Sequence, residues 1–456
     1  MKKTILIICV LFLFGRQSVL AQSFKLMRYD EDYSALKSDT SGKIYNKIKY
    51  IGLSANRSIY LSVGGEIRYE YAGKMDENWI AGQGYNYSLL QRYSLNTNLQ
   101  MGSRFRVFAQ INSGLENGSK YGPAPVDEDK LNVQDLFAEL KVWQKDDQSI
   151  SIRAGRQELN YGSGRLISVR EGTNLRLYFT GAKATYKSGL FSVDGFAMMA
   201  DQVNPGVFDN KPTHQVNLWG AYSTLIIRKG GNFDFYYLGT QNSNHRFEEG
   251  VADETRHTIA ARYWNYGGGF IYNLEGAYQF GTFGKGKINA WTAAVDIGYV
   301  FDQLKGKPSI NLRNDYISGD QKQGDGNLQT FNPLYPKGGY FGFNPLIGPA
   351  NLIDLHPYTT YSLSSKCDLQ ADVVFNWRYS IQDGLYRPSG NFNLPGAGSS
   401  QKYIGTTYLV SADYRFSRFF SLSSGAQYFR TGAFIQDVVK PTANSWFYNL
   451  QFTFKF

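Results

Sequence analysis

The chain has 456 residues, a formal net charge of +10 and two cysteines. It has no dense cluster of lysine and arginine, which excludes a nucleic-acid-binding patch. No run of about 18 apolar residues follows the N-terminus, which excludes a transmembrane helix. Tyrosine (34 residues) and phenylalanine (31 residues) are abundant although the mean hydropathy is −0.37. A membrane β-barrel combines both properties, because only alternate residues of its strands face lipid.

The N-terminus has the pattern of an export signal. A pair of lysines precedes an apolar run at residues 5–14, and small residues end at Ala21. We therefore predict a signal peptide over residues 1–21, cleaved after Ala21. Cys367 is then the only mature cysteine, so neither an intramolecular disulfide nor a metal–thiolate cluster is expected. Residues 22–58 are polar and charged, and we predict a periplasmic N-terminal segment there, either as short helix or as disorder.

From about Ile59 onward, apolar residues recur at every second position, which indicates strands and not helices. In the first such run the apolar positions are Leu61, Val63, Ile67, Tyr69 and Tyr71. The last run alternates in the same way, with Trp446, Tyr448, Leu450, Phe452, Phe454 and Phe456 on one face. A final strand that ends on an aromatic residue resembles the closing strand of a bacterial outer-membrane barrel, which the barrel-insertion machinery reads.

Short turns and long polar links mostly alternate between these strands, as in outer-membrane barrels. We expect short turns near residues 101–104, 144–147, 187–189, 228–231, 266–269, 364–366 and 417–418. We expect long links near residues 72–87, 113–132, 157–172, 200–214, 241–254, 318–350, 380–401 and 431–444. The pattern predicts an all-β fold: a transmembrane antiparallel up-and-down β-barrel of about 18 strands (16–18) over residues 59–456. A soluble β-sandwich or propeller is the alternative.

A set of arginines falls on the strand positions opposite the apolar face, which would line the lumen. These residues are Arg68, Arg92, Arg104, Arg106, Arg153, Arg176, Arg313, Arg378 and Arg415. Arginine stays charged and offers a planar donor fork that suits carboxylates and phosphates. An arginine-lined constriction would favour anions. Acidic residues share the same face, so the alternative is that these charges pair across strands and stiffen a polar interior.

Nothing in the sequence favours catalysis. The four histidines belong to no Ser/His/carboxylate or Asp/His grouping typical of outer-membrane enzymes, so we predict no enzyme, no catalytic residue and no cofactor. Asp320 and Asp325 could offer oxygen ligands to Ca²⁺. Their Gly/Asp-rich spacing is more typical of a turn, and we predict no metal site.

Three segments together resemble the alginate export family of outer-membrane porins. They are Ile152–Leu166, Tyr316–Asp320 with Thr330–Pro336 and Gly348–Leu352, and Trp377–Ser380 with Asp383–Tyr386. The resemblance implies an 18-stranded barrel that passes an anionic polysaccharide through an arginine-rich constriction. It implies that Arg153, Arg156, Arg165 and Arg378 belong to that constriction, and that Asn332–Pro336 is a plug or gating loop. The style of the signal peptide suggests a Bacteroidetes-type member.

We therefore expect a porin-like channel of the bacterial outer membrane that passes anionic solutes, with an anionic polysaccharide such as alginate as a candidate substrate. The alternative is a surface-exposed barrel whose loops bind a ligand or partner with little conduction. The other expected partners are outer-membrane lipid, lipopolysaccharide and the barrel-insertion machinery. We expect a monomer and no nucleic acid.

Overall fold

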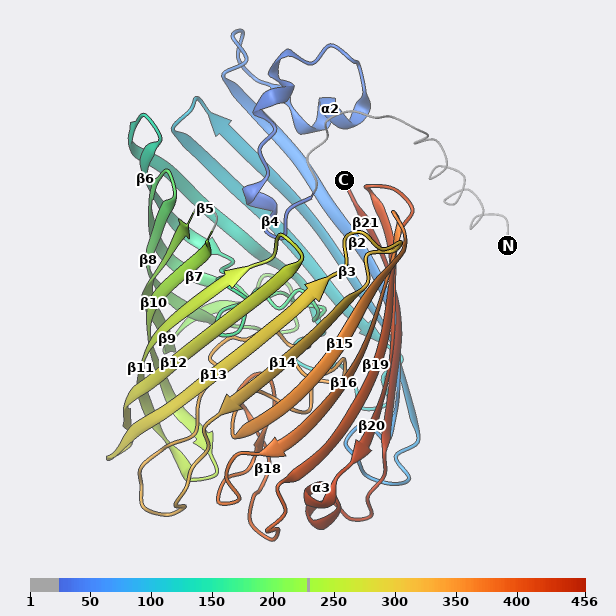
Figure 1. Cartoon of the computed structure of the whole chain (residues 1–456). Coiled ribbons are helices and arrows are strands. Elements are labelled where there is room, and N and C mark those ends of the chain that lie inside the picture. The colour runs from blue at the N-terminus through green and yellow to red at the C-terminus, as the bar shows by residue number, and fades with distance from the viewer. Residues whose placement is uncertain (1–23, 228–229) are drawn as a thin grey trace.

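The computed structural model describes residues 24–227 and 230–456, so the predicted signal peptide lies outside the described residues. Within these residues, nineteen strands form one antiparallel sheet, and eighteen of them close into a barrel (Figure 1). The barrel strands are β2 (Ile59–Met75), β3 (Tyr85–Met101), β4 (Phe105–Asn117), β5 (Asp129–Lys145), β6 (Gln148–Gln157), β7 (Phe179–Ser188), β8 (Phe191–Gln202), β9 (Lys211–Ile227), β10 (Gly231–Phe247), β11 (Gly250–Asn265), β12 (Phe270–Phe283), β13 (Gly286–Val300), β14 (Ser309–Ile317), β15 (Leu352–Ser364), β16 (Cys367–Arg378), β19 (Tyr403–Arg415), β20 (Phe420–Thr431) and β21 (Ser445–Lys455). The predicted all-β barrel and its strand number are confirmed.

The first and last barrel strands close the sheet. β2 pairs with β21 from Glu66↔Lys455 to Met75↔Trp446, so the barrel has no open edge. Closure is required in hydrocarbon, where every backbone N–H and C=O must find a partner within the protein. β1 (Ile51–Gly52) pairs with Tyr60 and Leu61 of β2, on the part of β2 that precedes its pairing with β21.

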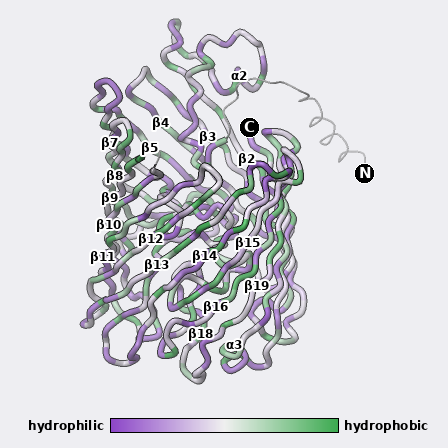
Figure 2. Tube along the Cα trace, in the orientation of Figure 1, coloured by the Kyte–Doolittle hydropathy of each residue, from purple (hydrophilic) through white to green (hydrophobic). Residues whose placement is uncertain are grey.

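The two faces of each strand are inverted relative to a soluble protein. In β2 the apolar side chains Ile67, Tyr69 and Tyr71 are exposed, whereas Glu66 and Arg68 are buried. Figure 2 shows the resulting alternation of hydrophobic and hydrophilic positions along the strands. Because the apolar positions face lipid and the polar positions face the lumen, the predicted period-two pattern is confirmed.

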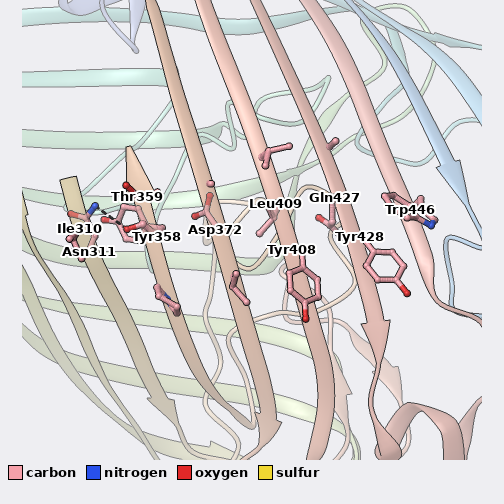
Figure 3. A pocket seen from close by; sticks show the side chains of 15 residues that line it. Ile310, Asn311, Tyr358, Thr359, Asp372, Tyr408, Leu409, Gln427, Tyr428 and Trp446 are labelled. Carbon is pink, nitrogen blue, oxygen red and sulfur yellow. Dashed lines mark hydrogen bonds between the residues drawn. The ribbon is translucent and has the colours of Figure 1, made fainter. Parts of the chain in front are cut away.

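The final strand follows the same rule. Trp446, Tyr448 and Leu450 are exposed, whereas Phe447 and Thr453 point inward and are buried. Figure 3 views this wall, where Tyr408, Tyr428 and Trp446 lie on the neighbouring strands β19, β20 and β21. A shallow groove runs between these rings and is almost entirely apolar. It therefore faces hydrocarbon, and a charged solute would find its site in the lumen instead.

The described connections follow the predicted alternation with two exceptions; the turn predicted at residues 228–231 lies partly outside the described residues. The long link predicted at residues 241–254 is wrong: β10 and β11 continue through it as a paired ladder and leave only Glu248 and Glu249 between them. Polar residues there suggested a loop, but polar positions in these strands face the lumen. β12 and β13 are also joined by only two residues, at 284–285. Most of the remaining long links gather at the end of the barrel opposite the C-terminus (Figure 1).

Short helices add to the strands but form no part of the barrel wall. The N-terminal segment contains η2 (Arg28–Asp30), η3 (Ser34–Ser38) and α2 (Ile44–Lys49), and α3 (Ala433–Val438) lies between β20 and β21. A small hairpin of β17 (Leu385–Tyr386) and β18 (Phe392–Leu394) lies in the link before β19. Across the described residues, no helix has the length and apolar character needed to cross a membrane.

Candidate functional site: a lumen narrowed by two inward loops

Two long connections fold into the barrel and meet there. The first follows β6 (residues 158–178) and the second follows β14 (residues 318–351); we call them the first and second inward loops. Tyr335 N–H donates to the Leu166 carbonyl and Ser168 N–H donates to the Tyr335 carbonyl, both at 2.8 Å. Apolar side chains of both loops are buried in one cluster with residues of the barrel wall: Leu159, Leu166, Ile167, Leu334, Phe341 and Ile347. The loops therefore narrow the lumen and are not surface flaps.

Arg165 fastens the first inward loop to the opposite wall. Its Nη1 lies 2.6 Å from Asp315 of β14, and its Nε lies 3.2 Å from Glu275 of β12. All three side chains are buried. Ser163 of the same loop donates a second hydrogen bond to Glu275, at 2.9 Å. Such a buried pair depends on both partners, because a lone buried charge is costly.

Tyr340 of the second inward loop lies at the centre of a group of cations. Arg165, Arg313 and Lys337 approach its ring centroid at 5.0, 5.7 and 5.1 Å. The Tyr340 side chain is buried, and its hydroxyl has no hydrogen-bond partner in the described structure. Arg313 is paired with Asp296 at 3.1 Å. We call Arg165, Arg313, Lys337 and Tyr340 the tyrosine-centred cation group.

Lys337 and Arg170 were not predicted from the sequence, because both lie in loops where strand alternation gives no signal. Among the described residues, no carboxylate lies within 4.0 Å of the charged group of either side chain. Arg165 and Arg313, in contrast, each form an ion pair. Burial and the neighbouring Arg313 and Arg165 lower the pKa of Lys337 to about 8. The Arg170 guanidinium donates to the Pro336 carbonyl, at 3.3 Å. The loop contact therefore carries two cations that no acid neutralises directly.

Three predicted arginines gather near β2 and β3: Arg68 and Arg92 stand on these strands, whereas Arg176 lies in the first inward loop and not on a strand as predicted. Arg92 bridges Glu66 and Glu171, each at 2.8 Å. Arg176 also contacts Glu171, at 2.8 Å. Arg68 forms no ion pair with any described residue, and it donates to the backbone carbonyl of Glu171 at 2.9 Å. Arg68 and Arg92 therefore hold the first inward loop against the wall through Glu171, and the Arg92–Glu66 contact between β3 and β2 is a pairing across strands of the kind that the alternative expected.

A further group of predicted arginines includes Arg106 on β4 and Arg153 on β6. Arg106 and Arg153 share Glu139 at 2.9 and 2.6 Å. Arg104 is exposed in the turn before β4 and, with Arg106, lines a cavity of about 570 Å³ beneath the N-terminal segment. This part of the barrel is therefore basic at its wall and partly neutralised by one shared acid.

Three predicted residues lie apart from these groups. Arg156 pairs with Asp201 where β6 and β8 end. Arg415 is half-exposed at the opposite end of the barrel and pairs with Asp368 at 2.9 Å. Arg378 is fully buried and donates to backbone carbonyls of residues 381–401, so it has no surface left for a solute. The constriction role that the family resemblance implied for Arg378 is therefore corrected to that of a loop anchor.

Two further buried arginines escaped the sequence prediction. Arg256 and Arg262 of β11 point into the lumen and pair with Glu254 and Asp234. They stand on alternate positions, so strand parity could have found them. The residues at the start of β11 were instead assigned to a loop, which removed the register on which that parity depends.

The Asp320 carboxylate has an unusual environment but no metal-binding geometry. Within the described residues, no group of three or more His, Cys, Asp or Glu side chains is placed to hold a metal ion. Asp320 is buried, and its Oδ2 has no hydrogen-bond partner. Its backbone N–H donates to Asp383 at 2.8 Å. Burial, followed by the nearby Asp383 charge, raises the pKa of Asp320 to about 7.

This raised pKa predicts that the second inward loop loosens as pH rises. Asp320 binds a proton in the folded loop up to pH of about 7, but an unfolded Asp releases it near pH 4, so stability falls between these values. We expect protease cleavage within residues 318–330 to be faster at pH 8 than at pH 5, relative to an unstructured reporter peptide. Asp320→Asn should remove this dependence; an unchanged dependence in that variant would assign it to another group.

An 18-strand antiparallel barrel with inward loops and a charged lumen defines an outer-membrane porin-like barrel, a class that is generally non-enzymatic. Residues 59–449 match the family model described as "Alginate export", and the chain belongs to this family. No curated protein sequence matches the chain.

Solved structures show the same fold at low sequence identity. OccAB1 of Acinetobacter baumannii is similar with a TM-score of 0.59 and 13% identity, covering 90% of this chain and 99% of that one. OccK2 (OpdF) of Pseudomonas aeruginosa, solved in complex with glucuronate, has a TM-score of 0.56 and 9% identity, covering 87% and 96%. A BenF-like porin of Pseudomonas fluorescens Pf-5 has a TM-score of 0.57 and 10% identity, covering 87% and 98%.

Proposed function

We propose that this protein is an anion-preferring channel whose selectivity arises where its two inward loops meet. The observation that carries the proposal is the tyrosine-centred cation group. Within the described structure, Lys337 forms no ion pair with a carboxylate there, and the buried Tyr340 hydroxyl has no hydrogen-bond partner. A cation in a narrow, poorly hydrated passage attracts anions and repels cations more strongly than it would in bulk water. Arg170 adds a second unneutralised charge beside it.

Carboxylated sugars are the substrate class that we propose. An ammonium group and a phenolic hydroxyl can together bind a carboxylate, and aromatic rings suit the apolar faces of pyranoses. Glucuronate, found bound in one structure with the same fold, is such a sugar acid. Membership of the alginate export family points to the same class, since alginate is a polymer of sugar acids. An anionic polysaccharide of this type is the proposed cargo of a monomeric, Bacteroidetes-type member.

The competing proposal is a barrel whose loops bind a ligand with little conduction. The apolar residues shared between the inward loops and the wall favour it, because they fill part of the lumen. Planar-bilayer conductance separates the two. Measurable conductance, with a reversal potential shifted toward the chloride equilibrium potential in a KCl gradient, supports the channel proposal. Absence of conductance, or cation selectivity, would contradict it.

Neutralising Lys337 tests the proposed selectivity. We expect Lys337→Gln to lower the chloride-to-potassium permeability ratio about two- to five-fold, the equivalent of roughly 0.5–1 kcal/mol at this site. The wild-type ratio should also fall between pH 7 and pH 9, because Lys337 loses its proton near pH 8, and Lys337→Gln should lack this fall. Reversal potentials measure both effects.

The same loop offers a matched control for this experiment. Lys322 is exposed, so Lys322→Gln removes an identical charge away from the loop contact and should leave selectivity unchanged. Tyr340→Phe keeps the ring and removes only the hydroxyl; we expect it to weaken current block by glucuronate with less effect on chloride selectivity. Equal effects of Lys337→Gln and Lys322→Gln would assign the selectivity to overall charge and not to this group.

A further inference from the structure

The N-terminal segment enters the lumen and contacts the predicted pore-lining arginines. Tyr29 is buried between Phe108 of β4 and Phe137 of β5, with ring centroids 5.7 and 5.3 Å away. Both rings stand on lumen-facing positions of the wall and are themselves buried. We call residues 26–30 the N-terminal hook.

The hook occupies donors that an anion would otherwise meet. The Tyr29 carbonyl accepts a 2.6 Å hydrogen bond from Arg106, and the Arg153 guanidinium lies over the Tyr29 ring at 4.3 Å. The Leu26 carbonyl accepts a 2.9 Å hydrogen bond from Arg176. One short segment therefore contacts three arginines, which lie on β4, on β6 and in the first inward loop.

The hook also holds both ends of the first inward loop. The Tyr29 hydroxyl donates to the carbonyl of Glu158 at 2.7 Å, and Arg176 lies near the other end of that loop. The segment is itself anchored at the barrel seam, because Arg28 and Lys49 donate to the Phe456 carbonyl at 2.8 and 3.0 Å. A purely peripheral extension would make none of these contacts inside the wall.

We propose that the N-terminal hook is part of the selectivity filter: Tyr29 covers Arg106 and Arg153 and positions the first inward loop, which limits both conductance and anion preference. This inference rests on the proposed channel function and names residues that set its selectivity. The sequence predicts a periplasmic segment over residues 22–58; its described part, from residue 24, thus reaches from that side into the pore.

Removing the Tyr29 ring tests the proposal in the full-length channel. We expect Tyr29→Ala to raise single-channel conductance at least about two-fold and to shift the reversal potential further toward chloride, because it widens the passage and uncovers two arginines. Ile44→Ala is the matched truncation in the same segment, at a side chain that is 70% exposed, and should change neither value. Wild-type conductance and selectivity in Tyr29→Ala would overturn the proposal.

A second measurement separates screening of the arginines from a structural effect. Arg153→Gln should change the permeability ratio strongly in the Tyr29→Ala background and little in the wild-type background. Equal changes in both backgrounds would show that the hook does not cover Arg153, and would also overturn the proposal. If Tyr29→Ala fails to give a heat-modifiable folded barrel on gels, Tyr29→Phe carries the test: it keeps the ring, loses the contact with Glu158, and should raise conductance without increasing anion preference.

The two proposals fail in different ways. A wild-type channel that prefers cations contradicts the proposed function, whatever the hook does. A wild-type channel that prefers anions, with Tyr29→Ala indistinguishable from it, contradicts only the role of the hook.

Discussion

Arg165→Gln is expected to release the first inward loop and to turn the channel toward cation preference. The substitution removes the only groups that contact both Glu275 and Asp315 in the described structure, and it leaves two buried carboxylates without their cation. Breaking a buried ion pair on one side costs about 3–5 kcal/mol, and hydration of the lumen reduces this figure. At the same time the constriction loses one positive charge.

Two measurements follow these consequences separately. Limited trypsin digestion of the folded barrel should cut within residues 158–178 at least about ten-fold faster in Arg165→Gln, the factor that corresponds to 1.4 kcal/mol of local stability. The reversal potential in a KCl gradient should move toward the potassium potential. Arg415→Gln is the matched control, because Arg415 is an exposed arginine with a single acid partner. Exposed pairs contribute little, so this variant should resemble the wild type.

A double substitution tests whether unpaired acids cause the effect. Arg165→Gln together with Glu275→Gln should recover part of the protection of the loop from protease, because one of the two carboxylates left without a cation becomes a neutral amide. Full protection of the loop in the single variant would show that the apolar contacts of Leu166 and Ile167 hold it without the ion pairs.

The barrel could be predicted from the sequence because lipid imposes one rule on every strand. An outward position such as Tyr69 must be apolar while its neighbours Arg68 and Glu70 face the lumen, and this rule needs no knowledge of distant residues. The rule failed at residues 241–254, which were predicted to be a loop. A strand segment with few apolar residues has the same polar composition as a loop, so the sequence does not distinguish the two.

The constriction could be predicted only in part, since its geometry depends on contacts between distant segments. Arg165 meets Asp315 across 150 positions of the chain, and no periodicity encodes that contact. Lys337 differs from the other lumen cations because, among the described residues, its neighbouring acids Asp296 and Asp315 pair with Arg313 and Arg165 instead. Arg378 is the opposite case. Its motif indicated a pore residue, but its N–H groups donate to backbone carbonyls and are not available to a solute. Residue type gave the candidate set, and burial and pairing decide which members remain available to a solute.

Arg378→Gln is expected to disorder the loop between β16 and β19 while leaving ion selectivity almost unchanged. The Arg378 guanidinium donates to five backbone carbonyls, from Ile381, Asp383, Gly396, Ser399 and Gln401, and lies over the Phe434 ring of α3 at 4.0 Å. Hydrogen bonds from a charged group contribute about 1.5–3 kcal/mol each, with strong overlap, and carbonyls left unpaired and buried add a further cost. We therefore expect a local loss of about 3–5 kcal/mol.

Protease sensitivity and selectivity together decide whether Arg378 is an anchor. We expect cleavage within residues 379–402 to accelerate more than about a hundred-fold in Arg378→Gln, as a loss near 3 kcal/mol implies, with the permeability ratio within error of the wild type. Arg378→Lys keeps the charge but replaces five N–H donors by three, so it should also loosen the loop. A constriction residue would behave in the opposite way, because lysine would preserve selectivity and glutamine would abolish it without exposing the loop. The Asn351 amide of the second inward loop donates to the carbonyls of Ser380, Asp383 and Gly384, so protection near Asn351 should also fall. The ion pairs of Arg165 with Asp315 and of Arg313 with Asp296 should keep the cation group in place.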